Sequence, residues 1–179
     1  GELTGEWGEI VERYQNVLPQ IEDPAGSFML HMHVGMVRAD RLEQLDDAVY
    51  HFQRAHAMDP ERDEPLARLE VLYRELAMWE ELAQVLRQRV DLAEDPEARM
   101  ELWRRLGEVY ETQLMDVEEA TACYLQILTI DEADIPAMNS LERIYEAFER
   151  WEDLIDILRQ KTEATFEPEA VVEIRFRIA

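Results

Sequence analysis

The side chains best suited to metal chemistry are gathered in one segment, Met29-Leu-His-Met-His-Val-Gly-Met36. Imidazole nitrogens and thioether sulfurs bind copper and other soft metals when they converge on one point. His31 and His33 are only two positions apart, and on a helix such residues point to different sides. We therefore expect no metal and no cofactor at this segment.

The same segment carries a possible recognition surface. Met29, Met32, His33 and Met36 are spaced so that they share one face of a helix. Methionine is flexible and polarisable, which suits contact with varied apolar partners. An apolar stripe of this kind also forms the core when a neighbouring repeat covers it. The sequence leaves both interpretations open.

Cys123 and the carboxylates offer little for catalysis. Cys123 is the only cysteine and no histidine follows it, so we expect a buried or interfacial thiol rather than a nucleophile. Adjacent carboxylates such as Glu80-Glu81 are common in an acidic chain and do not indicate acid–base chemistry. Asp131-Glu-Ala-Asp134 spells a helicase tetrapeptide, but no phosphate-binding Gly-x-x-x-x-Gly-Lys motif accompanies it. We predict that the chain is not an enzyme.

The charge narrows the classes of partner. The 179 residues include 41 acidic and 18 basic side chains, which gives a formal net charge of −23. Such a chain repels nucleic acid phosphates and anionic membranes, whereas basic partners remain open. The acidity also keeps a long repeat protein soluble. The absence of a signal peptide, of a bilayer-length apolar stretch and of a second cysteine favours a cytoplasmic location.

Two residue types recur at one long fixed interval. Trp7, Trp79 and Trp151 are equally spaced, and Pro24, Pro96 and Pro168 keep the same spacing. We call the distance from Trp7 to Trp79 the long interval. A long period through a whole chain indicates a solenoid of helical units that pack mainly on their neighbours. We expect each tryptophan to fill the turn of its own hairpin.

Helical signals cover nearly the whole chain. Apolar residues recur at helical spacing, and Asp95-Pro96 is a typical helix start, repeated at Asp23-Pro24. No run alternates for long enough to predict a strand. The pattern predicts ten helices, at about residues 5–18, 24–39, 44–58, 64–77, 79–93, 96–114, 117–130, 135–148, 150–165 and 168–179.

One run of residues points to a family. Trp103-x-x-Leu106-Gly107-x-x-Tyr110, followed by Ala120 and Tyr124, resembles the tetratricopeptide repeat. The earlier hairpin repeats this arrangement with Gly35, Ala48, Phe52, Ala55 and Pro60. Two other hairpins depart from it, with Leu69-Glu70 and Leu141-Glu142 where the family has Leu-Gly. The Trp-Glu-x-Leu element after each short turn looks like tandem arrays in large bacterial repeat proteins.

The resemblance implies an all-α fold, a right-handed α-solenoid of antiparallel helical hairpins with a 72-residue double repeat. We expect a single domain over residues 1–179, cut from a longer repeat protein. Its parts would be a half hairpin at 1–22, hairpins at about 23–60, 61–94, 95–132 and 133–166, and a partial hairpin at 167–179.

The family generally binds proteins or peptides in a concave groove formed by the first helix of each hairpin. The function implied is a non-catalytic protein-interaction scaffold whose partner is basic or carries an apolar anchor, besides the neighbouring repeats of the same chain. The alternative is a regulatory or dimerisation segment of a larger protein whose catalytic domain lies elsewhere. The implied groove has no lysine, so clamping of a C-terminal carboxylate is not expected. The implied partner-binding residues are Met29, Met32, His33, Met36, Val71, Arg74, Arg104, Glu108, Glu111, Asn139, Arg143 and Glu146.

Overall fold

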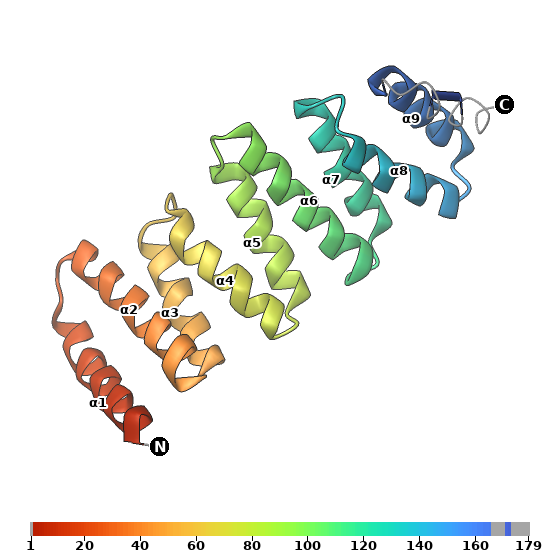
Figure 1. Ribbon diagram of the computed structural model, residues 1–179. Coiled ribbons are helices and arrows are strands. Elements are labelled where there is room, and N and C mark those ends of the chain that lie inside the picture. Colours follow the sequence, from red (N-terminus) through yellow and green to blue (C-terminus); the bar gives the residue numbers. More distant parts are fainter. Residues whose placement is uncertain (1, 166–170, 173–179) are drawn as a thin grey trace. The chain divides into compact units, whose positions relative to one another are not determined.

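The computed structural model describes residues 2–165 together with 171 and 172, and side chains from residue 6 onward. Over this part of the chain every regular element is a helix, which confirms the predicted all-α class. Figure 1 shows the two helices of each hairpin lying side by side and running in opposite directions. The elements are α1 (Glu2–Val17), the short 3-10 helix η1 (Leu18–Gln20), α2 (Pro24–Leu42), α3 (Leu45–Met58), α4 (Asp63–Glu75), α5 (Trp79–Leu92), α6 (Pro96–Thr112), α7 (Val117–Ile130), α8 (Ile135–Ala147) and α9 (Trp151–Ala164).

The nine α-helices of the described residues follow the first nine predicted ones closely. The tenth prediction, 168–179, lies almost wholly outside the described residues. The structure divides into two compact units, Gly1–Leu92 with α1–α5 and Ala93–Ala179 with α6–α9.

Three first helices begin with the same cap. The carboxylates of Asp23, Asp95 and Asp134 accept hydrogen bonds from the backbone N–H three residues on, at 2.8, 2.9 and 2.7 Å. A proline follows within the first turn of each helix, where its missing N–H breaks no hydrogen bond. Such a cap stabilises a helix by about 1 kcal/mol, so the aspartates determine where these helices start.

The turn inside each hairpin contains one residue in the left-handed region, at Glu43, Ala77, Met115 and Glu149, with φ of 54° or 55°. The turns have two lengths. In α2–α3 and α6–α7 the closing N–H reaches back six residues, from Gln44 to Arg38 and from Asp116 to Tyr110. In α4–α5 and α8–α9 it reaches back only five. The turns of the α2–α3 and α6–α7 hairpins are therefore one residue longer than those of the other two.

Two glycines let helices of a hairpin come close together. A Cβ added at Gly35 would lie 2.8 Å from the Phe52 ring, and one at Gly107 would lie 2.9 Å from the Tyr124 ring. Such distances are shorter than carbon atoms tolerate, so only glycine fits under either ring. The Leu-Gly positions noted in the sequence are therefore contact points between α2 and α3 and between α6 and α7.

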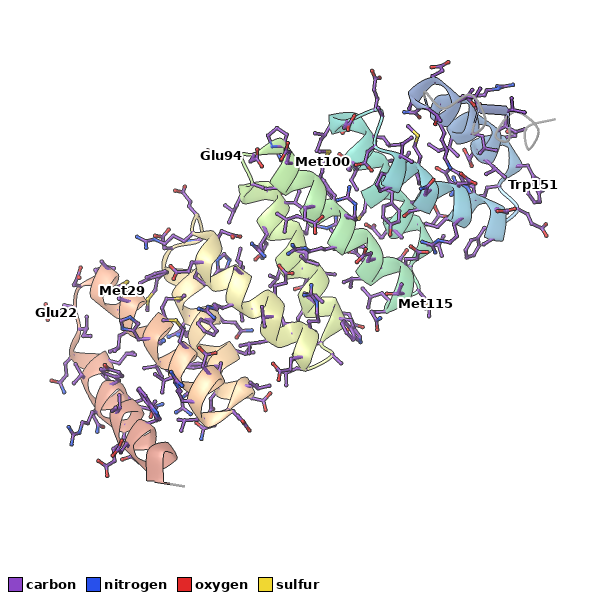
Figure 2. The ribbon with its side chains drawn as sticks, in the orientation of Figure 1. Glu22, Met29, Glu94, Met100, Met115 and Trp151 are labelled. Carbon is purple, nitrogen blue, oxygen red and sulfur yellow. The ribbon has the colours of Figure 1, made fainter. Side chains whose placement is uncertain are left out.

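The prediction that every tryptophan fills its own turn is wrong for Trp151. This residue opens α9, and 54% of its side chain is exposed (Figure 2). Trp7 and Trp79 are half-buried, and the Arg41 guanidinium lies 5.5 Å from the Trp7 ring centre. Cys123 is buried, as expected.

Candidate partner-binding surfaces

The first surface lies on α2 and α4. Met29 is 50% exposed near the start of α2 (Figure 2), His33 is exposed, and Met36 is half-buried. Arg68 of α4 donates a hydrogen bond to the Met36 sulfur at 3.7 Å, so the two helices meet at this point. Val71, one turn further along α4, is 58% exposed. We name these five residues the α2/α4 surface.

Met32 does not belong to this surface, which corrects the prediction from spacing. Its side chain is only 2% exposed. The reason is that α2 packs against both α1 and α3, so its buried arc is wider than that of a helix with one neighbour. The stripe seen in the sequence is therefore partly surface and partly core.

Arg74 follows Val71 on α4 and forms an ion pair with Glu70, with 2.9 Å between nitrogen and oxygen. Glu70 is itself buried, and it also pairs with Arg89 of α5. Arg89 in turn contacts Asp63 at 2.6 Å. The predicted binding residue Arg74 is thus the exposed end of an ion-pair network that joins α4 to α5.

The second surface lies on α6 and α8 and is polar. Arg143 of α8 forms a two-fold ion pair with Glu111 of α6, whose side chain is 12% exposed. Tyr124 donates a hydrogen bond to the same carboxylate at 3.0 Å. The hydrogen bonds with Glu111 raise the pKa of Arg143. Burial, followed by the charge of Glu111, raises the pKa of Tyr124, so both groups keep their protons at neutral pH.

The other predicted residues of this surface are mostly exposed. Arg104 bridges Glu101 at 2.9 Å and Asp134 at 3.0 Å. Glu108, Asn139 and Glu146 are exposed on the two helices. The six predicted residues of α6 and α8 lie on two helices that ion pairs join, Arg104–Asp134 and Arg143–Glu111, so both arginines are already held by carboxylates. We name this set the α6/α8 surface.

A histidine pair is the main polar feature that the sequence did not predict. Nδ1 of His31 on α2 and Nδ1 of His51 on α3 lie 3.0 Å apart, and the side chains are 2% and 4% exposed. One ring must donate and the other accept, so the accepting ring is neutral. Burial, then the charges of His31 and Arg38, lower the pKa of His51 to about 4. Burial likewise lowers the pKa of His31.

The prediction missed this pair because it weighed His31 only against residues of its own helix. The partner lies on the next helix, and only the packing of the hairpin brings the two rings together. Among the described side chains, no group of three or more histidines, cysteines, aspartates or glutamates is placed to hold a metal.

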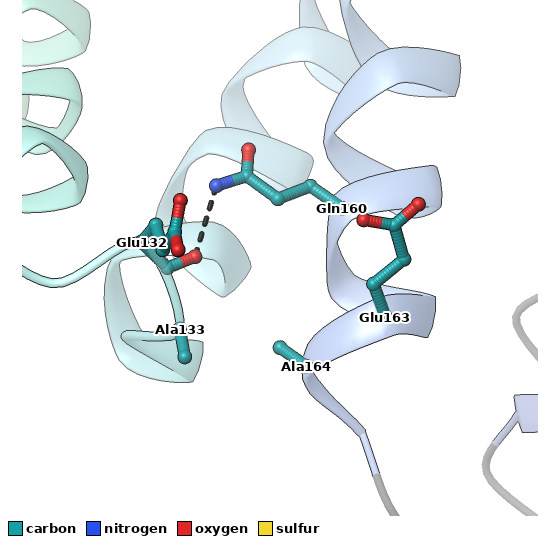
Figure 3. A pocket seen from close by; sticks show the side chains of 5 residues that line it. All are labelled: Glu132, Ala133, Gln160, Glu163 and Ala164. Atoms are coloured by element: carbon teal, nitrogen blue, oxygen red, sulfur yellow. Dashed lines mark hydrogen bonds between the residues drawn. The ribbon is translucent and has the colours of Figure 1, made fainter.

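A small surface pocket of about 210 Å³ lies between the α7–α8 turn and α9 (Figure 3). It is lined by Glu132, Ala133, Gln160, Glu163 and Ala164, and the Gln160 amide donates to the Glu132 carbonyl at 2.9 Å. Its lining contains two carboxylates and no basic side chain. In the part of the chain that the structure describes, no helix has the length and apolar character to cross a membrane.

Comparison with known proteins agrees with this fold. A family model of the tetratricopeptide repeat matches residues 66–100 and 137–169. These segments contain most of α4–α5 and α8–α9, the hairpins that lack the Leu-Gly pair. No curated protein sequence matches the chain.

Solved structures with similar folds include three repeat proteins at low identity. A crystal structure of MamA has a TM-score of 0.55 at 18% identity, covering 89% of each chain. A tetratricopeptide repeat protein from Parabacteroides merdae has 0.56 at 17%, covering 97% of this chain and 66% of the other. YrrB, described as a repeat protein with an unusual peptide-binding site, has 0.53 at 17%, covering 96% and 84%. The chain is a tetratricopeptide-like helical repeat protein.

Proposed function

We propose that this chain is a non-catalytic scaffold that binds a protein partner through the α2/α4 surface. Proteins with this fold generally mediate protein–protein interactions, which supports the class of function. The observation that carries the proposal is the exposure of Met29 on α2 and Val71 on α4, at 50% and 58%, on two helices that meet where Arg68 donates to the Met36 sulfur. Large exposed apolar side chains become an interaction site when they form one patch.

The chemistry of this surface suits an apolar anchor of the partner. Methionine side chains adjust to different shapes, and His33 and Arg68 add polar contacts at the edge. Interfaces of this kind have an apolar centre and a polar rim. Arg74, which is half-exposed, extends the rim along α4.

The α6/α8 surface would contribute polar contacts rather than an anchor. Its arginines already pair with carboxylates, as Arg143 does with Glu111. Exposed ion pairs contribute little binding energy, typically up to about 1 kcal/mol, but they favour one orientation of a partner. Glu108 and Asn139 are exposed beside this pair and would meet polar groups of the partner.

The proposal is tested by affinity capture from a lysate of the source cells, with the chain as bait. The test variant carries Met29→Glu, Met36→Glu and Val71→Glu. We expect a specific partner to bind the unchanged chain and to be lost by the variant, because carboxylates cannot enter an apolar contact without a large desolvation cost.

The matched control carries Met115→Glu, Leu125→Glu and Phe148→Glu, which are exposed by 74%, 42% and 57% in the second unit. It adds the same charge and removes a similar apolar area. Loss of the partner by both variants, or by neither, would contradict the assignment to α2/α4. Circular dichroism would show that both remain helical.

A further inference from the structure

The first unit contains a pocket whose lining is part apolar and part polar. It has a volume of about 210 Å³ and lies between α3 and α5, both of which pack against α4. Buried apolar side chains line it from two helices, Leu66 and Leu69 from α4 and Val85 from α5. This part of the lining suits methylene groups. Ligand sites for whole metabolites are usually larger, from about 300 Å³, so this pocket suits a single side chain.

The remaining lining is rich in hydrogen-bond acceptors. Gln53 of α3 donates to the Tyr73 hydroxyl at 2.7 Å, which leaves its own amide oxygen as an acceptor. His56 of α3 also lines the pocket, but its Nδ1 atom is buried and does not face the pocket space. From α5 come the carboxylate of Glu81 and the amides of two glutamines, Gln84 and Gln88. None of the lining side chains is a lysine or an arginine.

The negative charge of Glu81 acts on Tyr73, another residue of the pocket lining. Burial raises the pKa of Tyr73, the hydrogen bond from Gln53 lowers it, and the negative charge of Glu81 raises it. Because Glu81 lines the pocket, a cationic group there would face a carboxylate in a partly desolvated site, where such interactions are stronger than in bulk water.

The second unit differs in the part of this lining that comes from α3, although its helices are arranged in the same order. One long interval further along the chain, Gln53 is replaced by Leu125 and His56 by Leu128, which packs against the core of that unit. Helix α7 thus accepts leucine at both of these positions. The polar side chains at these two positions are therefore not needed to form the hairpins.

We propose that this pocket binds the side chain of an arginine from a basic partner. A guanidinium group has five N–H donors and no acceptor, which matches a lining with the Glu81 carboxylate and glutamine oxygens as acceptors. The apolar lining would contact the methylene stem. The net charge of −23 attracts a basic partner. The pocket does not include any residue of the α2/α4 surface, so this inference stands independently of that proposal.

The test is an NMR titration of the isotope-labelled chain with N-acetyl-arginine N-methylamide. The comparison probe is the citrulline compound, which has nearly the same shape but no charge. We expect the arginine probe to shift the side-chain amide signals of Gln53, Gln84 and Gln88. The citrulline probe should bind roughly tenfold more weakly, because hydrogen bonds to a charged group are the stronger ones.

Variants identify the groups responsible. Glu81→Gln should weaken binding roughly tenfold, whereas Glu80→Gln, which removes the same charge from an exposed neighbour outside the pocket, should leave it unchanged. Gln53→Leu copies the second unit and should weaken the shifts at Gln84 and Gln88 while the helical spectrum stays the same.

Three results would overturn the proposal. They are equal binding of citrulline and arginine, equal loss in the Glu80 and Glu81 variants, and the absence of shifts at the three glutamines with tens of millimolar arginine probe. The second result would mean that the probe senses only the general acidity of the chain.

Discussion

The α2–α3 and α6–α7 hairpins place different side chains on a similar frame. In both, a glycine of the first helix lies under an aromatic ring of the second, Gly35 under Phe52 and Gly107 under Tyr124. The ring differs by one hydroxyl. In the second unit that hydroxyl donates to Glu111, whereas the matching position one long interval earlier is Ala39. The hydroxyl and its acceptor are thus present together in one hairpin and absent together in the other.

A second pair of interior residues also differs between the two hairpins. The first unit has the hydrogen-bonded His31 and His51, and the second has Trp103 and Cys123 at the positions one long interval later. Both members of each pair change at once, because one buried polar group without a partner costs about 1–3 kcal/mol. The comparison teaches that the two units share the same helical hairpin. Polar residues that contact each other in one unit are replaced together in the other.

The largest expected effect concerns the buried glutamates. Glu70 pairs with Arg89, which also holds Asp63, whereas Glu142 pairs with Lys161 and position 135 is an isoleucine. Arg89→Met should lower the free energy of unfolding by about 3–4 kcal/mol, since it uncouples two carboxylates from one cation. Lys161→Met should cost about 2–3 kcal/mol. Urea denaturation measures both, and an equal or reversed order would refute this difference between the units.

A pH titration separates the histidine pair from its counterpart. Between pH 6.5 and about 4, His51 binds a proton in the unfolded chain but not in the folded one. The free energy of unfolding should therefore fall as the pH falls through this window, by up to about 3 kcal/mol from this group, and no further below it.

His51→Phe should remove this component of the pH dependence, and the exposed His33→Phe should not. The measurement is urea denaturation at a series of pH values, comparing slopes rather than absolute stabilities. Identical slopes for the original chain and the His51 variant would show that the pair does not exclude protons as described.

The glycines give a smaller effect that should be alike in both units. Gly35→Ala and Gly107→Ala should each destabilise the fold by about 1–3 kcal/mol, because the added Cβ would press on Phe52 or Tyr124. Gly8→Ala on α1 is the control, since a Cβ there meets nothing within 4 Å. This control should stabilise its helix by up to about 1 kcal/mol. Thermal unfolding measures all three variants. If only one of Gly35→Ala and Gly107→Ala lost stability, the close approach would exist in one hairpin and not in both.

The sequence predicted the helices well because their signals are local. Asp23 and Asp95 before proline mark helix starts, and apolar spacing marks the buried faces. The 72-residue double repeat remains a prediction, although residues at that interval often occupy comparable places. Family resemblance also led to the glycine contacts at Gly35 and Gly107.

The sequence failed where burial depends on a second neighbour. Met32 shares a helical face with Met29, yet it is buried because α1 and α3 both cover α2. His51 and the pocket that contains His56 were missed for the same reason, since their partners come from other helices. Trp151 shares its spacing with Trp79 but not its burial.

The most direct test of the central claim is site-specific photo-crosslinking in source-cell lysate. One variant carries p-benzoylphenylalanine in place of Val71 on the α2/α4 surface, and the other carries it in place of Asn139 on the α6/α8 surface. The account predicts a dominant crosslinked protein from position 71 and a much weaker product from position 139. No product at position 71, or equal yields from both positions, would contradict the claim that the first unit carries the apolar partner site.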